Sequence, residues 1–512
     1  MDRRIMVVVI IVVGAAVGIA AFAVRGPIGA VETTTTVVVA AEPEPALSTT
    51  STTVPIVVTT TTTTEPPRPE GSVPGDTVGE PWGATVGLTM FRGNPTRSFY
   101  GTGPVPSDPP SVSWRYPDSP MCGSSVVAGV SSVWCGTGWT GQPAVWERPD
   151  GVTEVVFGAY DKSVHFVDAE TGAPTRLPFP TGDIIKGSVT IDPDGFPLLY
   201  TGSRDNKLRV VALDRKPTEE LWALDAYEVR GIWNDDWDGN PVVVDDILYE
   251  GGENGWFFAI RLNRGYTEGL VSVEPEIVWS MPAWNDELLA RVGSNVSIES
   301  SVVVFERTVY FTNSGGRIVG VDMDLVDAHA EDPVVFDFWA GDDIDATMVA
   351  DADGMLYVAV ELERFNDRSA ELGQLISLDP SRPDDPVRWG VGVPGLGGSD
   401  GGMWATPAVA HGVVYVATHS GRLLAVDAAT GEVTWEDAVG FHAWSSPAVV
   451  DGRLVVGTCE AAELRSYDLT DPRRPVLDWS IQAAAGCIES TPAIWNGRIY
   501  VGSRDGYMRA YG

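Results

Sequence analysis

The segment richest in side chains able to bind a metal runs from Asn234 to Asn240 and reads Asn-Asp-Asp-Trp-Asp-Gly-Asn. Its oxygen-bearing residues have the spacing of a calcium-binding EF-hand loop, in which a glycine makes the sharp turn. Loop positions 1, 3, 5, 6 and 12 would be Asn234, Asp236, Asp238, Gly239 and Asp245. Pro241 and the strand-like sequence around it argue against a true EF-hand. Two interpretations remain open here, a calcium site and a turn rich in Asx residues.

The chain contains four cysteines, none in a CxxC or CxxCH arrangement, which excludes classical zinc fingers and attached c-type haem. Outside the cytoplasm they should pair. We expect one disulfide between Cys122 and Cys135 and another between Cys459 and Cys487. The alternative for the second pair is a zinc site, with ligands drawn from Cys459, Cys487, His419 and His442. The sequence has no GxSxG, HExxH or phosphate-binding loop.

An apolar segment near the N-terminus, before the strands that would position these side chains, predicts a membrane-spanning helix. Residues 5–24 are uncharged and almost wholly apolar, and a helix of that length, at about 1.5 Å per residue, covers the roughly 30 Å hydrocarbon core of a membrane. Because Arg3 and Arg4 precede it, we expect residues 1–4 to form a cytoplasmic tail and the rest of the chain to lie outside. A cleaved signal peptide is the alternative.

Residues 25–80 are rich in Thr and Pro. Such a segment cannot bury enough apolar surface to offset its chain entropy, so it predicts a disordered stalk between the anchor and a folded domain at 81–512. The formal net charge of the chain is −36, and most of it belongs to that domain. Such acidity repels phosphate backbones, and we therefore expect no nucleic-acid partner.

An internal repeat of about fifty residues runs through the expected domain. One marker is an Asp or Asn at the end of an alternating strand, at Asp168, Asp214, Asn263, Asp322, Asp379, Asp427 and Asp468. The other is a Trp in the next strand, at Trp222, Trp279, Trp339, Trp389, Trp435 and Trp479. Asp-Gly and Asn-Gly dipeptides, as at 451–452 and 496–497, predict tight hairpins between strands. Tandem units of four short antiparallel strands, with no helical periodicity after residue 30, predict an all-β propeller.

The repeat at 425–435, Ala-Val-Asp-Ala-Ala-Thr-Gly-Glu-Val-Thr-Trp, resembles the AxDxxTGxxxW repeat of propellers of the pyrroloquinoline-quinone (PQQ) type. Val167–Gly172 is a second good copy. Phe91–Pro95, which reads Phe-Arg-Gly-Asn-Pro, is similar to the leader that often precedes such propellers. The resemblance covers residues 85–512. It implies a fold more than a function, since the family includes quinone-dependent dehydrogenases and non-catalytic scaffolds.

The domain contains eight repeats, of which seven carry their own outer strand. The eighth stops at Gly512 after three strands, whereas residues 111–116 match the outer-strand pattern. We therefore predict an eight-bladed β-propeller of four-stranded antiparallel blades, with the last blade closed by this N-terminal strand. The repeated Trp and Asp residues would pack between blades and cap turns.

The residues that lead into the innermost strands should ring the mouth of the channel. Alignment of the repeats places there Thr140, Lys186, Asp238, Glu299, Asp345, Trp404, Trp444 and Glu489. Loops after the second strands reach the same face and add Arg204, Asp205, Glu253, Asn254, His419, Glu460, Arg504 and Asp505. We expect the four carboxylates of the ring to converge on one entrance that favours a divalent metal or a cationic ligand, and the two tryptophans to hold a sugar or apolar group. Solvated acids that point apart are the alternative.

The resemblance also implies roles for the first segment. Asn234–Asp238 is similar to the (H/N)DxWD stretch of quinoprotein alcohol dehydrogenases, so Asp238 would be the catalytic base of such an enzyme. A calcium ion would draw its ligands from Asn234, Asp236, Asp238, Glu253 and Asn254. The vicinal cysteine pair that stacks over the quinone in those enzymes is absent.

We therefore expect a membrane-anchored, extracytoplasmic scaffold without catalytic activity, which needs no cofactor and binds a protein or a small-molecule or glycan ligand at the channel mouth. Calcium at the acidic residues stays open. The alternative is a PQQ- and calcium-dependent quinoprotein dehydrogenase.

Overall fold

The computed structural model describes residues 77–127, 129–138, 141–393 and 401–512. The predicted membrane helix at 5–24, the tail before it and residues 25–76 of the predicted stalk lie outside this part of the chain. No helix within the described ranges combines the length and the apolar character that a bilayer crossing needs. The chain divides into two compact units, and the propeller described below belongs to the unit formed by Glu65–Val126 and Ser131–Gly512.

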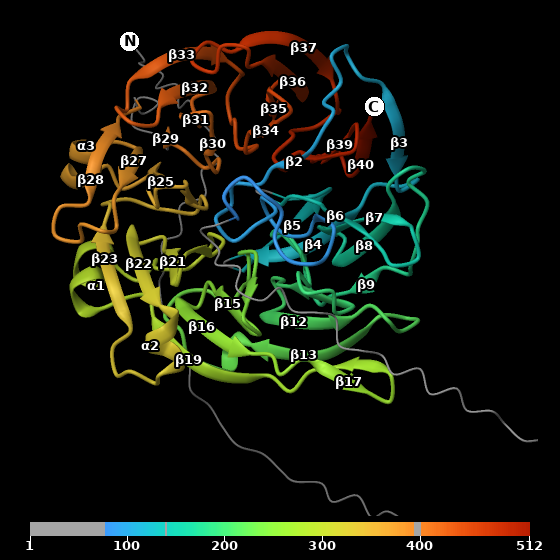
Figure 1. The fold of residues 1–512 in the computed structure, drawn as a ribbon, viewed down its shortest axis with the longest axis horizontal. Helices are drawn as coiled ribbons and strands as arrows, with labels where there is room; N and C mark the ends of the chain where they lie inside the picture. Colours follow the sequence, from blue (N-terminus) through green and yellow to red (C-terminus); the bar gives the residue numbers. More distant parts are fainter. Residues whose placement is uncertain (1–76, 128, 139–140, 394–400) are drawn as a thin grey trace, which may run out of the picture. The chain divides into compact units, whose positions relative to one another are not determined.

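Eight antiparallel sheets follow one another around a central axis, as Figure 1 shows. From the inner to the outer strand, blades 1 to 4 are β6 (Ala144–Glu147), β7 (Thr153–Ala159), β8 (Ser163–Asp168) and β9 (Phe179–Pro180); β10 (Thr190–Ile191), β11 (Leu198–Thr201), β12 (Lys207–Ala212) and β13 (Glu219–Asp225); β14 (Val242–Val244), β15 (Ile247–Gly251), β16 (Trp256–Arg261) and β19 (Glu276–Pro282); and β20 (Val303–Phe305), β21 (Thr308–Thr312), β22 (Arg317–Asp322) and β23 (Val334–Trp339).

Blades 5 to 8 continue in the same order. They are β24 (Val349–Ala350), β25 (Leu356–Ala359), β27 (Leu375–Leu378) and β28 (Val387–Val391); β30 (Ala408–Ala410), β31 (Val413–Ala417), β32 (Arg422–Asp427) and β33 (Val433–Ala438); β34 (Ala448–Val450), β35 (Arg453–Gly457), β36 (Glu463–Asp468) and β37 (Val476–Gln482); and β38 (Ala493–Trp495), β39 (Arg498–Gly502), β40 (Met508–Tyr511) and β3 (Val112–Tyr116). The prediction of an eight-bladed propeller is confirmed.

The N-terminal strand closes the ring, as predicted. Strand β3 pairs antiparallel with β40, with Val112 opposite Tyr511 and Tyr116 opposite Met508. Figure 1 shows β3 beside the last strands of the chain. The closing strand gives β40 a hydrogen-bonding partner and so removes the edge that a linear array would leave open.

The repeated residues fix turns and neighbouring blades, also as predicted. A carboxylate oxygen of Asp427 accepts hydrogen bonds from two backbone N–H groups of the turn that follows it. In that turn Gly431 has φ 75°, and a Cβ there would lie 2.7 Å from the indole of Trp389 in the preceding blade. Trp114 of blade 8 covers Gly172 of blade 1 in the same way. Glycine is therefore required both by the positive φ and by the tryptophan that packs on it.

The predicted tight hairpins are present. Asp451 and Gly452, between β34 and β35, have φ values of 53° and 69°. Asn496 and Gly497, between β38 and β39, have φ values of 47° and 88°. Positive φ at both central residues is the requirement of a type I′ turn, whose twist matches that of the strands.

The leader before β3 contacts the inner edges of the blades. Strand β1 (Gly87–Leu88) pairs with β6 of blade 1, and β2 (Gly101–Thr102) pairs in parallel with β38 of blade 8. Between them Arg92 and Arg97 are fully buried. Their guanidinium groups donate hydrogen bonds of 2.8–2.9 Å to the backbone carbonyls of Asn240, Val302, Thr406 and Pro447, which lead into the inner strands of blades 3, 4, 6 and 7.

The sequence shows no helical periodicity after residue 30, yet the described residues include short helices. Three short helices interrupt the connections, α1 (Asp286–Val292), α2 (Met323–Asp327) and α3 (Asp367–Leu372), together with the 3₁₀ turn η2 (Ala226–Glu228). Asn285, Asp322 and Asn366 cap the first backbone N–H groups of α1, α2 and α3. Each helix spans two turns or fewer, too short to produce a visible 3.6-residue pattern.

Candidate functional site

The predicted mouth residues lie at one end of the blades. They occupy two kinds of segment, the connection that leads into an inner strand and the hairpin between the second and third strands. Lys186 and Asp238 precede β10 and β14, Glu299 precedes β20, and Glu253 follows β15. Thr140 lies outside the described residues.

Lys186, which leads into blade 2, lies among three carboxyl groups, two from blade 3 and one from blade 4. Its Nζ contacts a carboxylate oxygen of Asp238 closely, and it lies 3.3 Å from Glu253 and 3.9 Å from Glu299. One oxygen from each of the three acids lies within 4.8 Å of the others. The side chain of Asp238 is only 3 % exposed, that of Glu253 5 % and that of Lys186 14 %. The structure therefore brings two of the predicted ring acids together around the predicted lysine.

The charges of this cluster depend on one another. Burial raises the pKa of Asp238 well above the ordinary range, although Lys186 opposes the shift. Burial also raises the pKa of Glu299, and neighbouring carboxylates add to the effect. Burial alone would lower the pKa of Lys186, but Asp238 and the other two acids outweigh it and hold the pKa well above its usual value. The lysine is thus a fixed positive charge.

The first residues of the same segment are partly paired. Arg204 forms a close ion pair with Asp236. Asn234 donates hydrogen bonds from Nδ2 to Asp236 at 3.0 Å and to Glu253 at 2.6 Å. Burial, with the charge of Glu253, raises the pKa of Asp236 to about 7, against the opposing effect of Arg204.

Asn254 turns away from this cluster. Its Oδ1 accepts a hydrogen bond from the backbone N–H of Trp256 at 3.0 Å. Its Nδ2 donates to the carbonyls of Ala226 and Val229 at 3.4 and 3.3 Å. Both ends of the amide are therefore engaged in holding loops.

Asp345 belongs to a neighbouring group of acids that sequence alignment only partly identified. It accepts a hydrogen bond of 2.9 Å from Ser314. Its charge is the second cause, after burial, of the raised pKa of Glu299. Asp343 and Glu361 lie beside it and were missed, because alignment considered only one residue of each connection. The backbone N–H of Glu361 donates to the carbonyl of Asp343 at 2.8 Å.

Trp404 and Trp444 meet two histidines on blades 6 and 7. The two indoles lie 5.8 Å apart, and His419 lies 4.2 Å from Trp404, measured between ring centroids. Trp444 Nε1 donates to His419 Nδ1 at 2.8 Å, and His442 stacks on Trp444 at 5.0 Å. Burial lowers the pKa of His419 to about 4, and His442 adds to the effect. This neutral aromatic cluster is formed by Trp404, His419, His442 and Trp444.

Glu489, like Asp345, does not join Asp238 and Glu299 around Lys186. Its carboxylate lies 3.4 Å from Arg504. Cys459 and Cys487 form a disulfide beside it, and Cys122 and Cys135 form the other. Both predicted disulfides are confirmed, and the zinc alternative loses its thiolates.

Comparison with known families identifies the type of domain. Residues 372–511 match a PQQ-repeat family model described as outer membrane protein assembly factor BamB. This match includes residues 425–435, which carry the AxDxxTGxxxW motif. The domain is a PQQ-like β-propeller. No curated protein matches the sequence significantly.

Solved structures share the propeller fold at low identity. Quinohemoprotein alcohol dehydrogenase from Comamonas testosteroni is 13% identical, with a TM-score of 0.55, over 83% of this chain and 80% of that one. Quinohemoprotein alcohol dehydrogenase ADHIIG from Pseudomonas putida HK5 is 12% identical, with a TM-score of 0.56 and the same coverage. BamB from Moraxella catarrhalis is 13% identical over 78% of this chain and 99% of that one, with a TM-score of only 0.39. These likenesses establish the fold alone.

The residues of this PQQ-like propeller do not fit a quinone-bound calcium ion. The Lys186 ammonium contacts Asp238 and lies near Glu253, so a positive charge already lies among the carboxylates that would coordinate the ion. Asn254, which would supply an amide oxygen, uses that oxygen for a backbone N–H. Neither disulfide is vicinal, since the paired cysteines are 13 and 28 residues apart.

Proposed function

We propose that this chain is a non-catalytic binding scaffold, displayed by an N-terminal membrane anchor on the extracytoplasmic side. The observation that carries the first part is the position of Lys186. Its ammonium compensates Asp238 and Glu253, the residues that a quinoprotein would use as base and calcium ligand. Such pairing stabilises a fixed surface, and the ammonium occupies the carboxyl group that a substrate would have to approach.

The surface proposed for ligands is the mouth end of the blades. Its acidic half carries the cluster around Lys186, whereas its aromatic half carries Trp404, His419, His442 and Trp444. Aromatic faces bind sugar rings, apolar groups and cations, and a cationic group would also be attracted by the acidic half. A protein segment or a small-molecule or glycan ligand with such groups is the expected partner.

The quinoprotein alternative has one observation in its favour, the likeness in fold to two quinohemoprotein alcohol dehydrogenases. The purified protein, incubated with PQQ and calcium chloride, separates the two proposals. Dye-linked oxidation of alcohols or sugars would support the dehydrogenase and overturn the scaffold.

Membrane anchoring has its own test. If residues 5–24 form an anchor, extraction with alkaline carbonate leaves the protein in the membrane pellet. External protease should then release an intact fragment from about residue 80 onward, because cleavage concentrates in unstructured stalks. Soluble mature protein that begins near Val24 would show instead that the segment is a cleaved signal.

A further inference from the structure

Two segments of the chain carry the same acidic motif. Asp235-Asp236-Trp237-Asp238 leads into β14 of blade 3, and Asp342-Asp343-Ile344-Asp345 leads into β24 of blade 5. In each blade a glutamate follows the second strand, at Glu253 and Glu361. We call Asp236, Asp238 and Glu253 the first acidic site, and Asp343, Asp345 and Glu361 the second acidic site.

The two sites differ in the cations that compensate them. The first site has two, because Lys186 contacts Asp238 and Arg204 contacts Asp236. Lys186 comes from the connection that leads into the preceding blade, blade 2. The equivalent residue for the second site, in the connection that leads into blade 4, is Glu299. The second site thus has a further carboxylate where the first has an ammonium.

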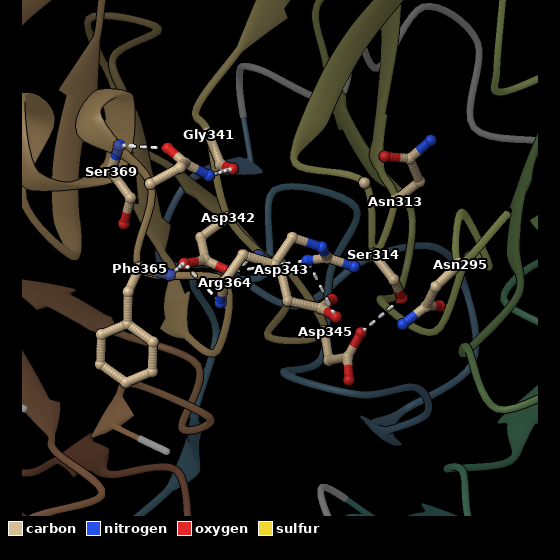
Figure 2. Close-up of polar contacts among 12 residues, drawn as sticks. Asn295, Asn313, Ser314, Gly341, Asp342, Asp343, Asp345, Arg364, Phe365 and Ser369 are labelled. Atoms are coloured by element: carbon tan, nitrogen blue, oxygen red, sulfur yellow. Dashed lines mark hydrogen bonds and ion pairs between the residues drawn. The ribbon is translucent and has the colours of Figure 1, made fainter. Parts of the chain in front are cut away.

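Arg364 pairs with one acid of the second site and is shared with a neighbouring aspartate. It lies 3.4 Å from Asp343 and 3.5 Å from Asp342. Figure 2 shows its guanidinium beside Asp343, while Asp345 points toward Ser314. Asp342 is further occupied by the backbone N–H groups of Arg364 and Phe365 at 3.0–3.1 Å. One guanidinium therefore faces several acids, and no ion pair links it to Asp345 or Glu361 among the described residues.

Two carboxyl groups of the second site are buried with unpartnered oxygens. Glu361 is 1% exposed and Asp343 is 3% exposed. Within the described ranges, Glu361 Oε1 and Asp343 Oδ1 have no hydrogen-bond partner. An unpaired buried carboxylate costs several kcal/mol, so such groups are retained where a proton or a cation satisfies them. Burial, followed by the charges of Asp345 and Asp343, raises the pKa of Glu361 well above its ordinary range.

We propose that the second acidic site binds a divalent cation, with Asp343, Asp345 and Glu361 as ligands and calcium as the preferred ion. Calcium takes six to eight oxygen ligands in flexible geometry and completes its shell with water, whereas magnesium demands a near-ideal octahedron. Ser314 borders the site with a hydroxyl oxygen. The oxygens of Asp343, Asp345 and Glu361 do not all lie within 4.8 Å of one another, unlike those around Lys186, so binding requires at least one of the three side chains to move toward the ion. The proposal is independent of the proposed scaffold function.

Isothermal titration calorimetry of calcium chloride into the full chain tests the proposal. We expect one calcium ion per chain, bound at least tenfold more tightly than magnesium. Glu361→Gln and Asp345→Asn should each weaken calcium binding at least tenfold. Asp238→Asn, the matched change at the first acidic site, should leave the affinity within threefold.

The remaining outcomes overturn the proposal. They are the absence of calcium binding to the wild type, unchanged binding in both second-site variants, and loss of binding in Asp238→Asn. Thermal unfolding without calcium guards against misfolded variants. Glu361→Gln removes a potential like charge, so its melting temperature in a chelator should equal or exceed that of the wild type. At one calcium concentration, the melting temperature should rise for the wild type and for Asp238→Asn, and less or not at all for the two second-site variants.

Discussion

Replacing Lys186 by Met should destabilise the propeller strongly. The substitution keeps most of the apolar stem but removes the ammonium that contacts Asp238 and lies near Glu253 and Glu299. All four side chains are at most 15% exposed, so water replaces the lost interaction poorly. Breaking a buried pair by removing one partner costs about 3–5 kcal/mol, and we expect a loss of that size in the free energy of unfolding at pH 8.

The loss should shrink as the pH falls. In the variant Asp238 and Glu299 keep pKa values above those of the unfolded chain, because burial already raises the pKa values of both groups. The folded state then binds more protons than the unfolded state, so stability is gained as the pH falls below the folded pKa values and approaches those of the unfolded chain. Urea unfolding followed by tryptophan fluorescence at pH 8 and pH 5 measures both effects.

Lys162→Met is the matched control for this experiment. Lys162 lies 3.3 Å from Asp183, but its side chain is 31% exposed. Exposed ion pairs contribute about 0–1 kcal/mol, so this variant should lose no more than that. The double variant Lys186→Met with Asp238→Asn should recover at least about 1 kcal/mol of the single variant's loss, because one uncompensated acid is gone. A loss for Lys186→Met no larger than that of Lys162→Met, or a double variant no more stable than the single, would refute the reasoning.

Three further predictions concern the leader, the closure and the aromatic cluster. Arg97→Met leaves the carbonyls of Phe91, Asn240 and Val302 without their donor. At about 1 kcal/mol or more per buried group, the variant should lose at least about 3 kcal/mol of unfolding free energy in urea. The exposed control Arg382→Met should lose under about 1 kcal/mol, and equal losses would contradict the prediction. A chain that begins at residue 120 should aggregate in size-exclusion chromatography while one that begins at residue 85 stays monodisperse, and equal behaviour would count against closure by β3. The pKa of His419 is lowered to about 4, so as the pH falls from about 6.5 to about 4 the unfolded chain takes up a proton before the folded one. Wild-type stability should therefore drop by up to about 3 kcal/mol over that window. A His419→Asn variant with the same pH dependence in urea unfolding would disprove the assignment.

The fold could be predicted because its signals are local and repeated. Asp451-Gly452 and Asn496-Gly497 specify tight hairpins by their own conformational preferences. Similar dipeptides recur in other repeats, so the same turn is predicted several times. The closing strand at 111–116 was predictable because the last repeat lacked one strand. The leader's interior was not, because Arg92 and Arg97 stand in a polar, turn-like sequence that ordinarily lies on a surface. Only the assembled ring supplies the carbonyls that satisfy them.

The candidate site could be predicted in part. Lys186, Asp238 and Glu299 were found because they occupy the same place in successive repeats. Asn254 was assigned to calcium from sequence neighbourhood, whereas its amide holds backbone groups of distant loops. Glu361 was missed although a signal exists, the second copy of the Asp-Asp-x-Asp motif with a glutamate after the next strand. The pairing of Lys186 with acids of the next blades could not be predicted, because it depends on distances between blades and not on the sequence of any one repeat.

The pairing of Val112 with Tyr511 sets a waiting time during synthesis. Strand β3 (Val112–Tyr116) leaves the ribosome long before its partner β40 (Met508–Tyr511) has been synthesised. At roughly 5–20 residues per second, the closing strand waits on the order of 20–80 s for its partner. Every earlier blade can form its hairpins meanwhile, yet the ring stays an open array whose first and last edges are available to other chains. The two edges stay open until β40 has been synthesised, so crowded expression should yield aggregates joined through them.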